Sequence, residues 1–454
     1  MTISPVPRLS TLACAIALGL AVHGLTPDAR AADLVEVIRD AKANDAAYAS
    51  ARAALEAGRE KLPQGRSLVL PTLSASGNIG NSFNNVSSLA GTGTTRVERD
   101  PRTIGWSVAL SQPLYRPQNW IQYDQAEYQV AQAEAQFGLA TQDLIVRTAQ
   151  AYFDVLTSQD NLAFIQAQKA AISEQLAQAK RNFEVGTATI TDTNEAQARF
   201  DLALSQEIAA QNDIELKKRA LQSIIGKFPD NLAPLGTRFT LSPPQPTRMD
   251  DWVETAQKAS YAVRIQEASS VIAEREIQRN RAGHLPTLDV VGSVGRAIAS
   301  NNVNTGIGSD IFTTSIGLQL AVPIYQGGVV DSRIREAIAN RDRSRADLEN
   351  ARRQAALTAR QSFLGVTNGM AQVRALEQAV ISSETALASN RLGYEVGVRI
   401  NIDVLNAQQQ LFSTKRDLAK ARYDTIMNGL RLKAAAGSLA ESDLEDVNRL
   451  LGSN

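Results

Sequence analysis

The spacing of apolar residues along the chain changes in the same order in each half of the sequence. Helical spacing comes first, alternation between apolar and polar positions follows, and a much longer stretch of helical spacing closes the half. This order predicts a helix, a pair of strands and a long helical hairpin, built twice. The predicted elements are helices at 32–62 and 250–282, strands at 68–83, 102–115, 284–299 and 312–325, and hairpins at 118–228 and 329–437.

The alternating segments have the pattern of strands that cross a membrane. In the first of them, Leu73 and Ile79 fall on one face, while serine, threonine and asparagine fill the other. Each segment is about ten residues long, which is the length a tilted strand needs to span a bilayer. The connectors at 84–100 and 300–310 are rich in Asn, Ser, Thr and Gly, so we expect them to be solvent loops.

The long helical stretches are too extended for an ordinary globular helix. No proline lies between Pro117 and Pro229, and Leu139, Val146 and Phe153 recur at intervals of seven among many alanines. Small residues beside a heptad seam let helices pack closely and supercoil. A helix over 120–183 would be about 95 Å long and would need neighbours along its whole length.

Two similar motifs mark the point where each long helix turns back. FEVGTATITDTNEAQ begins at Phe183 and YEVGVRINIDVLNAQ begins at Tyr394, and the glycine in each is a natural helix stop. The duplication therefore covers whole structural units. The duplication gives a first repeat at 32–228, a linker at 229–249 and a second repeat at 250–437, with a C-terminal segment at 438–454 after them and a signal peptide at 1–31 before them.

The N-terminus has the features of a secretory signal peptide. Arg8 supplies positive charge, residues 12–22 are apolar, and Ala29-Arg30-Ala31 is a small-x-small cleavage site. Leu12-Ala13-Cys14 faintly resembles a lipoprotein cleavage site, but its apolar run follows the cysteine instead of preceding it. We therefore expect an exported chain that begins at Ala32.

Composition excludes several classes of function. The formal net charge is zero, which argues against nucleic acid as a partner. The sequence holds one cysteine, Cys14, and two histidines, His23 and His284. A metal site needs clustered ligands and a catalytic triad needs a base with partners, and a lone His284 supplies neither. We expect no enzyme activity and no cofactor, with His284 in a structural role.

Four strands are too few to close a barrel in a membrane, where the smallest barrels use about eight. An open sheet would leave unpaired backbone groups in lipid, so the chain must share its strands with copies of itself in a ring. Three chains would give twelve strands.

The chain resembles the TolC-like outer membrane efflux protein family over essentially its whole length after residue 31. The resemblance rests on the two hairpin motifs together with GHLPTLD at Gly283, PIYQGG at Pro323, AQAYFDVL at Ala149 and ARYDTIMNGLRLKAAAGSL at Ala421. It implies a mixed α/β membrane protein, a homotrimer in the outer membrane of a Gram-negative bacterium with a periplasmic extension. In that fold a trimeric 12-stranded β-barrel, with four strands per chain, continues into a long α-helical barrel, and the segments at 229–249 and 438–454 form a small equatorial domain. It also implies an exit duct for drugs or secreted proteins, with a periplasmic adaptor and an RND, ABC or MFS inner-membrane transporter as partners.

The resemblance implies a gate at the hairpin tips. The matching positions are Thr191 and Asp192 in the first half and Tyr394 and Arg399 in the second. Bonds from Asp192 to the Tyr394 hydroxyl and from Arg399 to Thr191 would have a charged group on one side. The competing interpretation is that Asp and Arg at helix ends serve as caps and complement the helix dipole.

The resemblance also places a constriction at Asp403, where a trimer would bring three carboxylates together. The family often carries a second carboxylate one turn further on, where this chain has Asn406, so cation selectivity is an open question. We assign the strand-to-helix turns to Pro113, Pro323, Gly327 and Gly328.

A different class of function remains to be weighed. A periplasmic coiled-coil adaptor or scaffold without a pore would also have long helical hairpins. It would lack the four alternating strands, which favour the duct.

Overall fold

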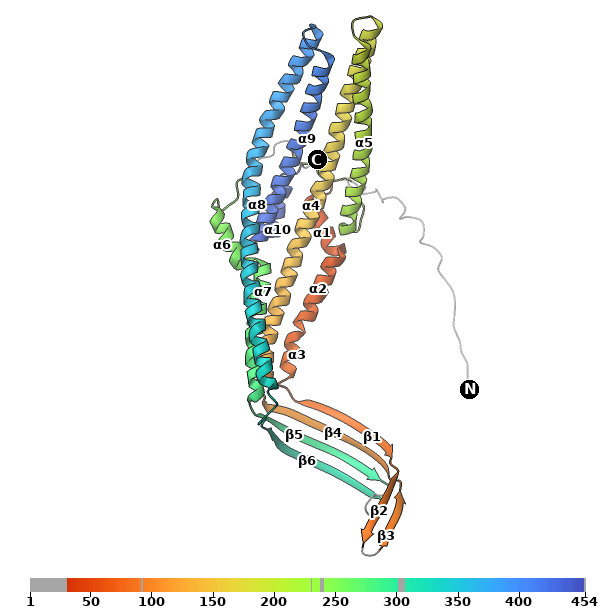
Figure 1. Ribbon diagram of the computed structural model, residues 1–454, viewed down its shortest axis with the longest axis vertical. Helices are drawn as coiled ribbons and strands as arrows, with labels where there is room; N and C mark the ends of the chain where they lie inside the picture. The colour runs from red at the N-terminus through yellow and green to blue at the C-terminus, as the bar shows by residue number, and fades with distance from the viewer. Residues whose placement is uncertain (1–30, 91–92, 230, 237–240, 301–306, 453–454) are drawn as a thin grey trace, which may run out of the picture.

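The computed structural model describes residues 31–90, 93–229, 231–236, 241–300 and 307–452. The predicted signal peptide at 1–31 therefore lies outside the described residues, apart from its last position. The described chain is mostly helical, with a four-stranded sheet at one end (Figure 1). None of the helices within these ranges combines the length and the apolar character required to cross a membrane.

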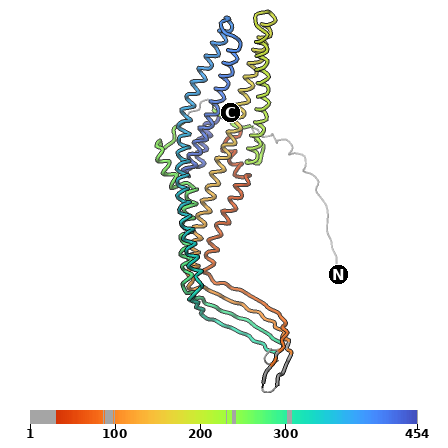
Figure 2. Tube along the Cα trace, viewed as in Figure 1, coloured from red at the N-terminus to blue at the C-terminus, as the bar shows by residue number. Residues whose placement is uncertain are grey.

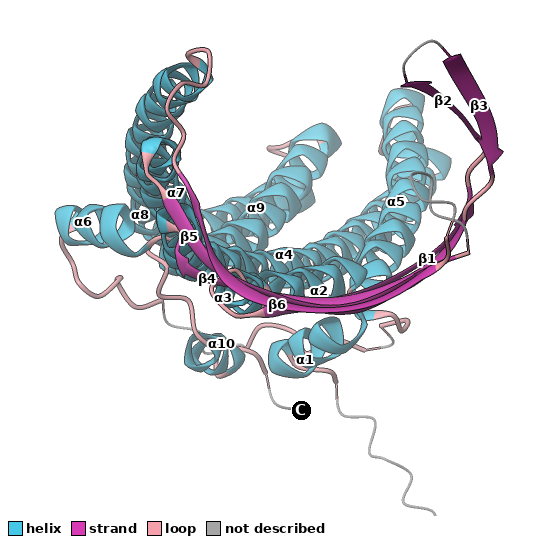
Figure 3. Ribbon diagram, turned by 90° about the horizontal axis from the view of Figure 1, so that it is seen from below, coloured by secondary structure: helices cyan, strands magenta, loops and turns pink. Residues whose placement is uncertain are grey.

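One antiparallel sheet holds a strand pair from each half. Its order is β1 (Thr72–Asn81), β4 (Arg102–Tyr115), β5 (Thr287–Ala299) and β6 (Ser309–Ala321). The β4–β5 pair joins the two halves in the middle, so β1 and β6 are the two edges. Seen from its own end of the molecule, the sheet is an arc and not a flat layer (Figure 3).

The strand register gives the sheet one apolar face and one polar face. Val108 of β4 lies opposite Ala75 of β1 and Val294 of β5, so these three side chains share a face. The same face carries Leu73, Ile79, Ile104, Trp106, Leu110, Leu288, Val290, Ile298, Ile316, Leu318 and Leu320.

On the opposite, polar face, hydroxyl groups pair across the strands. The Oγ atoms of Ser76 and Ser107 are 2.9 Å apart, and those of Ser293 and Ser315 are 2.8 Å apart. The large residues of the apolar face are exposed, with Leu318 at 69% and Ile316 at 83% of their full accessibility. Exposed apolar surface of this extent needs an apolar environment or a partner.

The connector at 84–100 is not the solvent loop that its composition predicts. It forms a two-stranded ribbon, β2 (Asn84–Ala90) and β3 (Gly93–Arg99), that extends beyond the sheet (Figure 1). Pairing between the two strands satisfies the backbone hydrogen-bonding groups of this segment. The polar side chains of the segment do not indicate this pairing in the sequence. The second connector falls largely on residues 301–306, which lie outside the described ranges.

The strand-to-helix turns differ from the prediction in one respect. Pro113 lies inside β4, next to a register shift between Pro113 and Tyr115, and the turn falls at Arg116. An irregular position tolerates proline because it needs no ladder hydrogen bond there. In the second half, Pro323, Gly327 and Gly328 do lie between β6 and the next helix, and both glycines have positive φ.

Each predicted opening helix is interrupted. The first becomes α1 (Leu34–Asn44), α2 (Ala46–Arg59) and α3 (Lys61–Ser67), and the second becomes α6 (Met249–Ala259) and α7 (Tyr261–Arg281), followed by a short 3-10 turn, η1 (Ala282–His284). Asp45 causes one interruption, because its backbone is extended and its carboxylate accepts a hydrogen bond from the Tyr48 amide at 2.7 Å. Such an N-cap starts a new helix where the periodicity alone suggests continuity.

The two long hairpins dominate the rest of the molecule. The first is α4 (Pro117–Glu184) with α5 (Ile190–Ile225), and the second is α8 (Val329–Glu395) with α9 (Asn401–Ala435). Their tips lie at the end of the molecule opposite the sheet (Figure 2). Within the wall that they form, α9 packs against both α8 and α4.

The main hydrophobic core lies at mid-height, where the linker and C-terminal segments meet the wall. Large buried side chains from α1, α4, α5, α9 and α10 (Glu441–Asn448) belong to one cluster. Single bridges join Ala32 to Leu232 and Leu235 to Leu451, which bring the linker beside both ends of the chain. Helices α1 and α10 lie outside the arc of the wall (Figure 3). We call this level the waist.

The duplication is visible where each hairpin ends at the waist. The first hairpin ends at Gly226, and a Cβ there would lie 2.9 Å from the Cβ of Asn44, just before α2. The second ends at Gly437, where a Cβ would lie 2.4 Å from the carbonyl of Ala259, just before α7. Both glycines have positive φ. In each half, therefore, the end of the second hairpin helix packs against the start of a short helix.

Candidate functional site at the hairpin tips

The two hairpin turns have nearly the same backbone. Gly186 and Gly397 adopt φ of 77° and 78°. After each glycine the chain bonds back to the end of the long helix, with Thr187 N–H to the Asn182 carbonyl at 2.8 Å and Val398 N–H to the Gly393 carbonyl at 2.8 Å. These are helix C-terminal bonds that the glycine conformation permits.

At the first tip, Asp192 serves the start of α5. Its carboxylate accepts hydrogen bonds from the Thr189 amide at 3.0 Å and from the Thr189 hydroxyl at 2.7 Å, and its own amide donates to that hydroxyl at 3.3 Å. This reciprocal arrangement is a capping box. Thr191 is exposed beside it.

At the second tip, Tyr394 and Arg399 bond to residues outside the turn itself. The Tyr394 hydroxyl accepts a hydrogen bond from the Asn182 amide of the first hairpin at 3.2 Å. The Arg399 guanidinium pairs with Asp403 one turn along, at 3.5 Å between Nη1 and Oδ2. Helix α9 begins after Ile400, which offers no side-chain cap.

The links expected between the tips are therefore not formed within one chain. In the described residues, Asp192 bonds to Thr189 in place of Tyr394, and Arg399 bonds to Asp403 in place of Thr191. The capping interpretation of Asp192 accounts for its contacts. A link between neighbouring copies would be a separate contact, which a single chain does not test.

The two predicted constriction residues lie one helical turn apart on α9 and have different partners. Asp403 is half-buried and bonded to Arg399, whereas the exposed Asn406 accepts a hydrogen bond from Arg199 of α5 at 3.1 Å. The same guanidinium donates to Gln409 at 2.6 Å. Asn406 thus helps to join the two hairpins in this chain.

Several contacts across the hairpins were not predicted from the sequence. The side-chain amide of Gln175 donates from Nε2 to the side-chain oxygen Oδ1 of Asn401 at 2.5 Å, in a buried position near the tips. Nearer the waist, the Tyr423 hydroxyl donates to Asp160 at 2.8 Å. Burial raises the pKa of Asp160, although the bond from Tyr423 works in the opposite direction.

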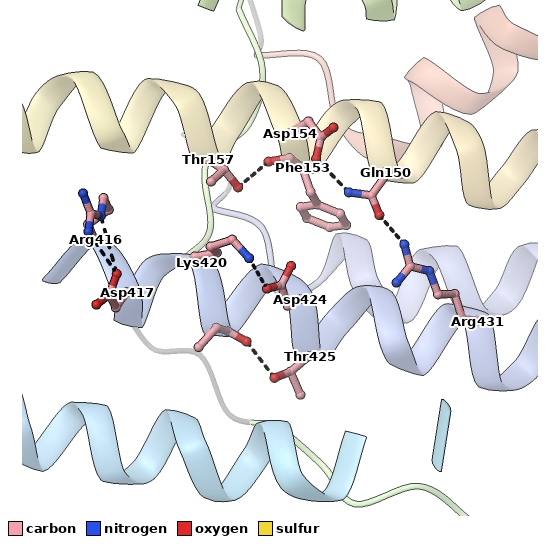
Figure 4. Close-up of polar contacts among 11 residues, drawn as sticks. Gln150, Phe153, Asp154, Thr157, Arg416, Asp417, Lys420, Asp424, Thr425 and Arg431 are labelled. Atoms are coloured by element: carbon pink, nitrogen blue, oxygen red, sulfur yellow. Dashed lines mark hydrogen bonds and ion pairs between the residues drawn. The ribbon is translucent and has the colours of Figure 1, made fainter. Parts of the chain in front are cut away.

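A further set of polar contacts crosses the wall at the waist (Figure 4). Arg431 of α9 donates to the side-chain oxygen Oε1 of Gln150 on α4 at 2.7 Å, and Nε2 of the same side chain donates to Asp154 at 2.7 Å. The other oxygen of Asp154 lies 3.6 Å from the ammonium of Lys217 on α5. Three helices are joined by this chain of contacts.

Metal-ligating side chains are not gathered at the tips or elsewhere in the described ranges. No group of three His, Cys, Asp or Glu side chains there is arranged to hold an ion. The imidazole Nε2 of His284 lies 3.5 Å from Asp331, at the sheet end of the helices.

Comparison with known proteins identifies the class of molecule that has this architecture. The model of the outer membrane efflux protein family matches residues 37–227 and 252–438, one match for each half. The chain belongs to the outer membrane efflux protein family.

Curated relatives are similar along nearly the whole chain. The chain is 34% identical over 422 residues to the outer membrane protein TolC of Vibrio cholerae, covering 92% of this chain and 93% of the relative. It is also 34% identical over 425 residues to the alkaline protease secretion protein AprF of Pseudomonas aeruginosa, covering 93% and 88%.

Among solved structures, the CmeC outer membrane channel of Campylobacter jejuni has the same fold. It superposes with a TM-score of 0.78 at 16% identity, covering 98% of both chains. The resemblance noted in the sequence is therefore confirmed, and so is the location in the outer membrane. The family is one of channel and transport proteins and not of enzymes.

Proposed function

We propose that the chain is one third of a channel-tunnel in the outer membrane, the exit duct of a tripartite efflux pump, of a type I secretion system, or of both. The observation that carries this proposal is the curved, four-stranded sheet with one apolar and one polar face. A sheet of this kind suits a wall between lipid and water.

The free edges of the sheet support a homotrimer. Strands β1 and β6 each leave one side of their backbone unpaired within the described chain, and lipid offers no hydrogen-bonding partner. Pairing β1 of one copy with β6 of the next satisfies both edges. Three copies of four strands give a closed 12-stranded barrel, with residues such as Leu318 toward outer-membrane lipid and Ser315 toward the lumen.

In this arrangement the helical hairpins form a second, α-helical barrel that extends into the periplasm, and their tips form its entrance. At these tips, Thr191, Asp192, Tyr394 and Arg399 bond across neighbouring copies and hold the entrance closed. Three copies of Asp403 form a carboxylate ring that attracts cations. Asn406 adds no charge to that ring.

The partners follow from the place of a passive duct in an export system. A periplasmic adaptor seats the duct on an inner-membrane transporter of the RND, ABC or MFS type, which supplies the energy. Drugs and secreted proteins are both suitable cargo, and a relative named for protease secretion supports the latter.

The alternative, a periplasmic adaptor or scaffold without a pore, gives the amphipathic sheet no role. Membrane fractionation separates the two functions. The duct should sediment with the outer membrane as a trimer that resists detergent until it is heated. A monomer in the periplasmic fraction would favour the scaffold instead.

A further inference from the structure

A cavity lies in the helical wall at the point where one helix ends and another begins. Helix α9 ends at Ala435 and α7 begins at Tyr261, and each of them packs against both α4 and α8. The two helices therefore occupy the same place between α4 and α8 at different heights. The cavity at the break between them has a volume of about 760 Å³, which is within the range of sites that bind small organic molecules.

Part of the lining of this cavity is apolar and comes from three long helices. It includes Leu139 and Val146 of α4, Ala351 and Ala355 of α8, and Ala434 and Ala435 of α9. Alanine is frequent among these residues, and its short side chain leaves the space that a larger side chain would fill. An apolar surface of this kind favours contact with the apolar body of a ligand over contact with water.

Three buried polar side chains also line the cavity. Gln142, Ser260 and Ser362 are 6%, 8% and 7% exposed, and within the described ranges their side chains form no hydrogen bond. Other buried polar side chains, such as Gln125 and Thr425, are bonded. Since a buried hydrogen-bonding group without a partner costs free energy, three such groups around one space indicate a partner that the chain itself does not provide.

The start of α7 adds hydrogen-bond donors to the same space. Ser260 is the residue before this helix, and its hydroxyl does not cap the first turn. Ala262 of that turn also lines the cavity, and the first backbone N–H groups of a helix have no partner within the helix. The Ser260 hydroxyl, these amides and the Gln142 side-chain amide can therefore donate to an acceptor oxygen on a ligand.

The charge of the lining favours a cationic ligand. The ionisable residues of the lining are Asp143, Asp347 and Arg431, so two carboxylates face one guanidinium. Asp347 forms no ion pair within the described part of the chain, and Asp143 lies 3.6 Å from Arg147. Arg431 already donates to Gln150. A net negative lining attracts a cation and repels an anion of the same size.

We propose that this cavity is a binding site for amphipathic organic cations. The apolar body of the ligand lies against the alanines, an oxygen of the ligand accepts hydrogen bonds from Ser260, Ser362 or Gln142, and the positive charge lies beside Asp143 and Asp347. The inference goes beyond the proposed duct, because the whole lining comes from one chain and binding there requires neither a pore nor a neighbouring copy.

Fluorescence anisotropy with rhodamine 6G tests the site in the purified full-length protein. This dye combines a planar aromatic body, an ester carbonyl and a positive charge, whereas fluorescein has the same three-ring body with negative charge. After correction for detergent alone, the protein should bind rhodamine 6G saturably, with one dye per chain. Binding should be at least about tenfold tighter than that of fluorescein, and it should weaken with added salt.

Two substitutions each remove one feature that recognises the ligand. Asp347→Asn should weaken rhodamine 6G binding about threefold, the effect of losing one exposed charge pair. Glu336→Gln removes an exposed carboxylate from the same helix outside the cavity and should leave binding unchanged. Ser362→Ala should weaken binding about fivefold without lowering the unfolding temperature of the free protein, because the hydroxyl has no partner there to lose.

Filling the cavity is the decisive variant. Gln354→Trp places a large ring in the lining from an exposed position on α8 and should abolish saturable binding, whereas Gln372→Trp, exposed on the same helix outside the cavity, should retain it. Unchanged binding in Gln354→Trp, or equal affinity for fluorescein, would overturn the site. Conductance of the same samples separates the two proposals: dye binding without a pore would reject the duct alone, and a conducting trimer without saturable binding would reject the site alone.

Discussion

The two hairpin tips have similar sequences and similar backbones, but they are stabilised in different ways. The first is self-contained, because Thr189 and Asp192 cap α5 with a reciprocal pair of side-chain bonds. The second has no side-chain cap at Ile400, and its Tyr394 depends on Asn182 of the other hairpin. The first tip can therefore stay ordered by itself, whereas the second is held by contacts that it can exchange for others.

The sharpest test of this contrast is to release the second tip. Tyr394→Phe combined with Arg399→Ser removes one hydroxyl and one cation from the proposed gate. Single-channel conductance should rise several-fold, because the closed entrance loses its charged and hydrogen-bonded links. Arg391→Ser removes a cation from the same helix, at an exposed position, and should leave conductance unchanged. Equal conductance in all three proteins would count against the gate assignment.

Charge at the second tip can be tested separately. Asp403→Ala should abolish block by trivalent cations added from the periplasmic side, because the three-carboxylate ring would be lost. Glu395→Ala, which removes an exposed carboxylate from the same tip, should keep the block. Block that persists in Asp403→Ala would place the constriction elsewhere.

The first tip should respond to loss of its cap. Thr189→Ala should lower the local stability of the α5 start by about 1 kcal/mol, the usual cost of removing an N-cap hydroxyl. Asp403→Asn at the α9 start should cost only a few tenths of a kcal/mol, because its partner Arg399 is exposed. Hydrogen exchange of the two helix starts measures both values. Equal losses at the two tips would remove the contrast.

The waist gives a small pH effect with a defined sign. Burial raises the pKa of Asp160 above its usual 3.8, so the folded chain holds this proton more tightly than the unfolded chain does. Its contribution to stability is complete below pH 3.8 and is lost as the pH rises through the raised pKa. Asp160→Asn should flatten this part of the pH dependence in denaturant melts, and an unchanged pH dependence in this variant would contradict the assignment to Asp160.

The periodicity of apolar residues and the positions of proline and glycine were enough to predict the elements that depend on local sequence. The long runs without proline predicted α4 and α8. The glycines of the FEVG and YEVG motifs predicted the turns at Gly186 and Gly397. The alternating segments predicted the four strands of the sheet, because each strand has one polar face and one apolar face. The family resemblance rested on sequence motifs, including the two at the hairpin tips.

Pairing between distant segments could not be predicted in the same way. The β2–β3 ribbon is held by backbone hydrogen bonds between its two strands, and its polar side chains give no alternating pattern that would predict them. The partners of Tyr394 and Asn406 are Asn182 and Arg199, which are more than two hundred positions away and have no distinctive spacing. Asp192 was assigned to a gate by resemblance, while its contacts within the chain are those of a cap, and one side chain can serve both roles in a trimer.

Single-channel recording measures whether three copies of this chain enclose a duct. Purified trimer added to a planar bilayer should give discrete conductance steps that are small and cation-preferring while the tips are closed. Well-folded trimer from outer membranes that never conducts, even with Tyr394→Phe and Arg399→Ser in place, would contradict the account.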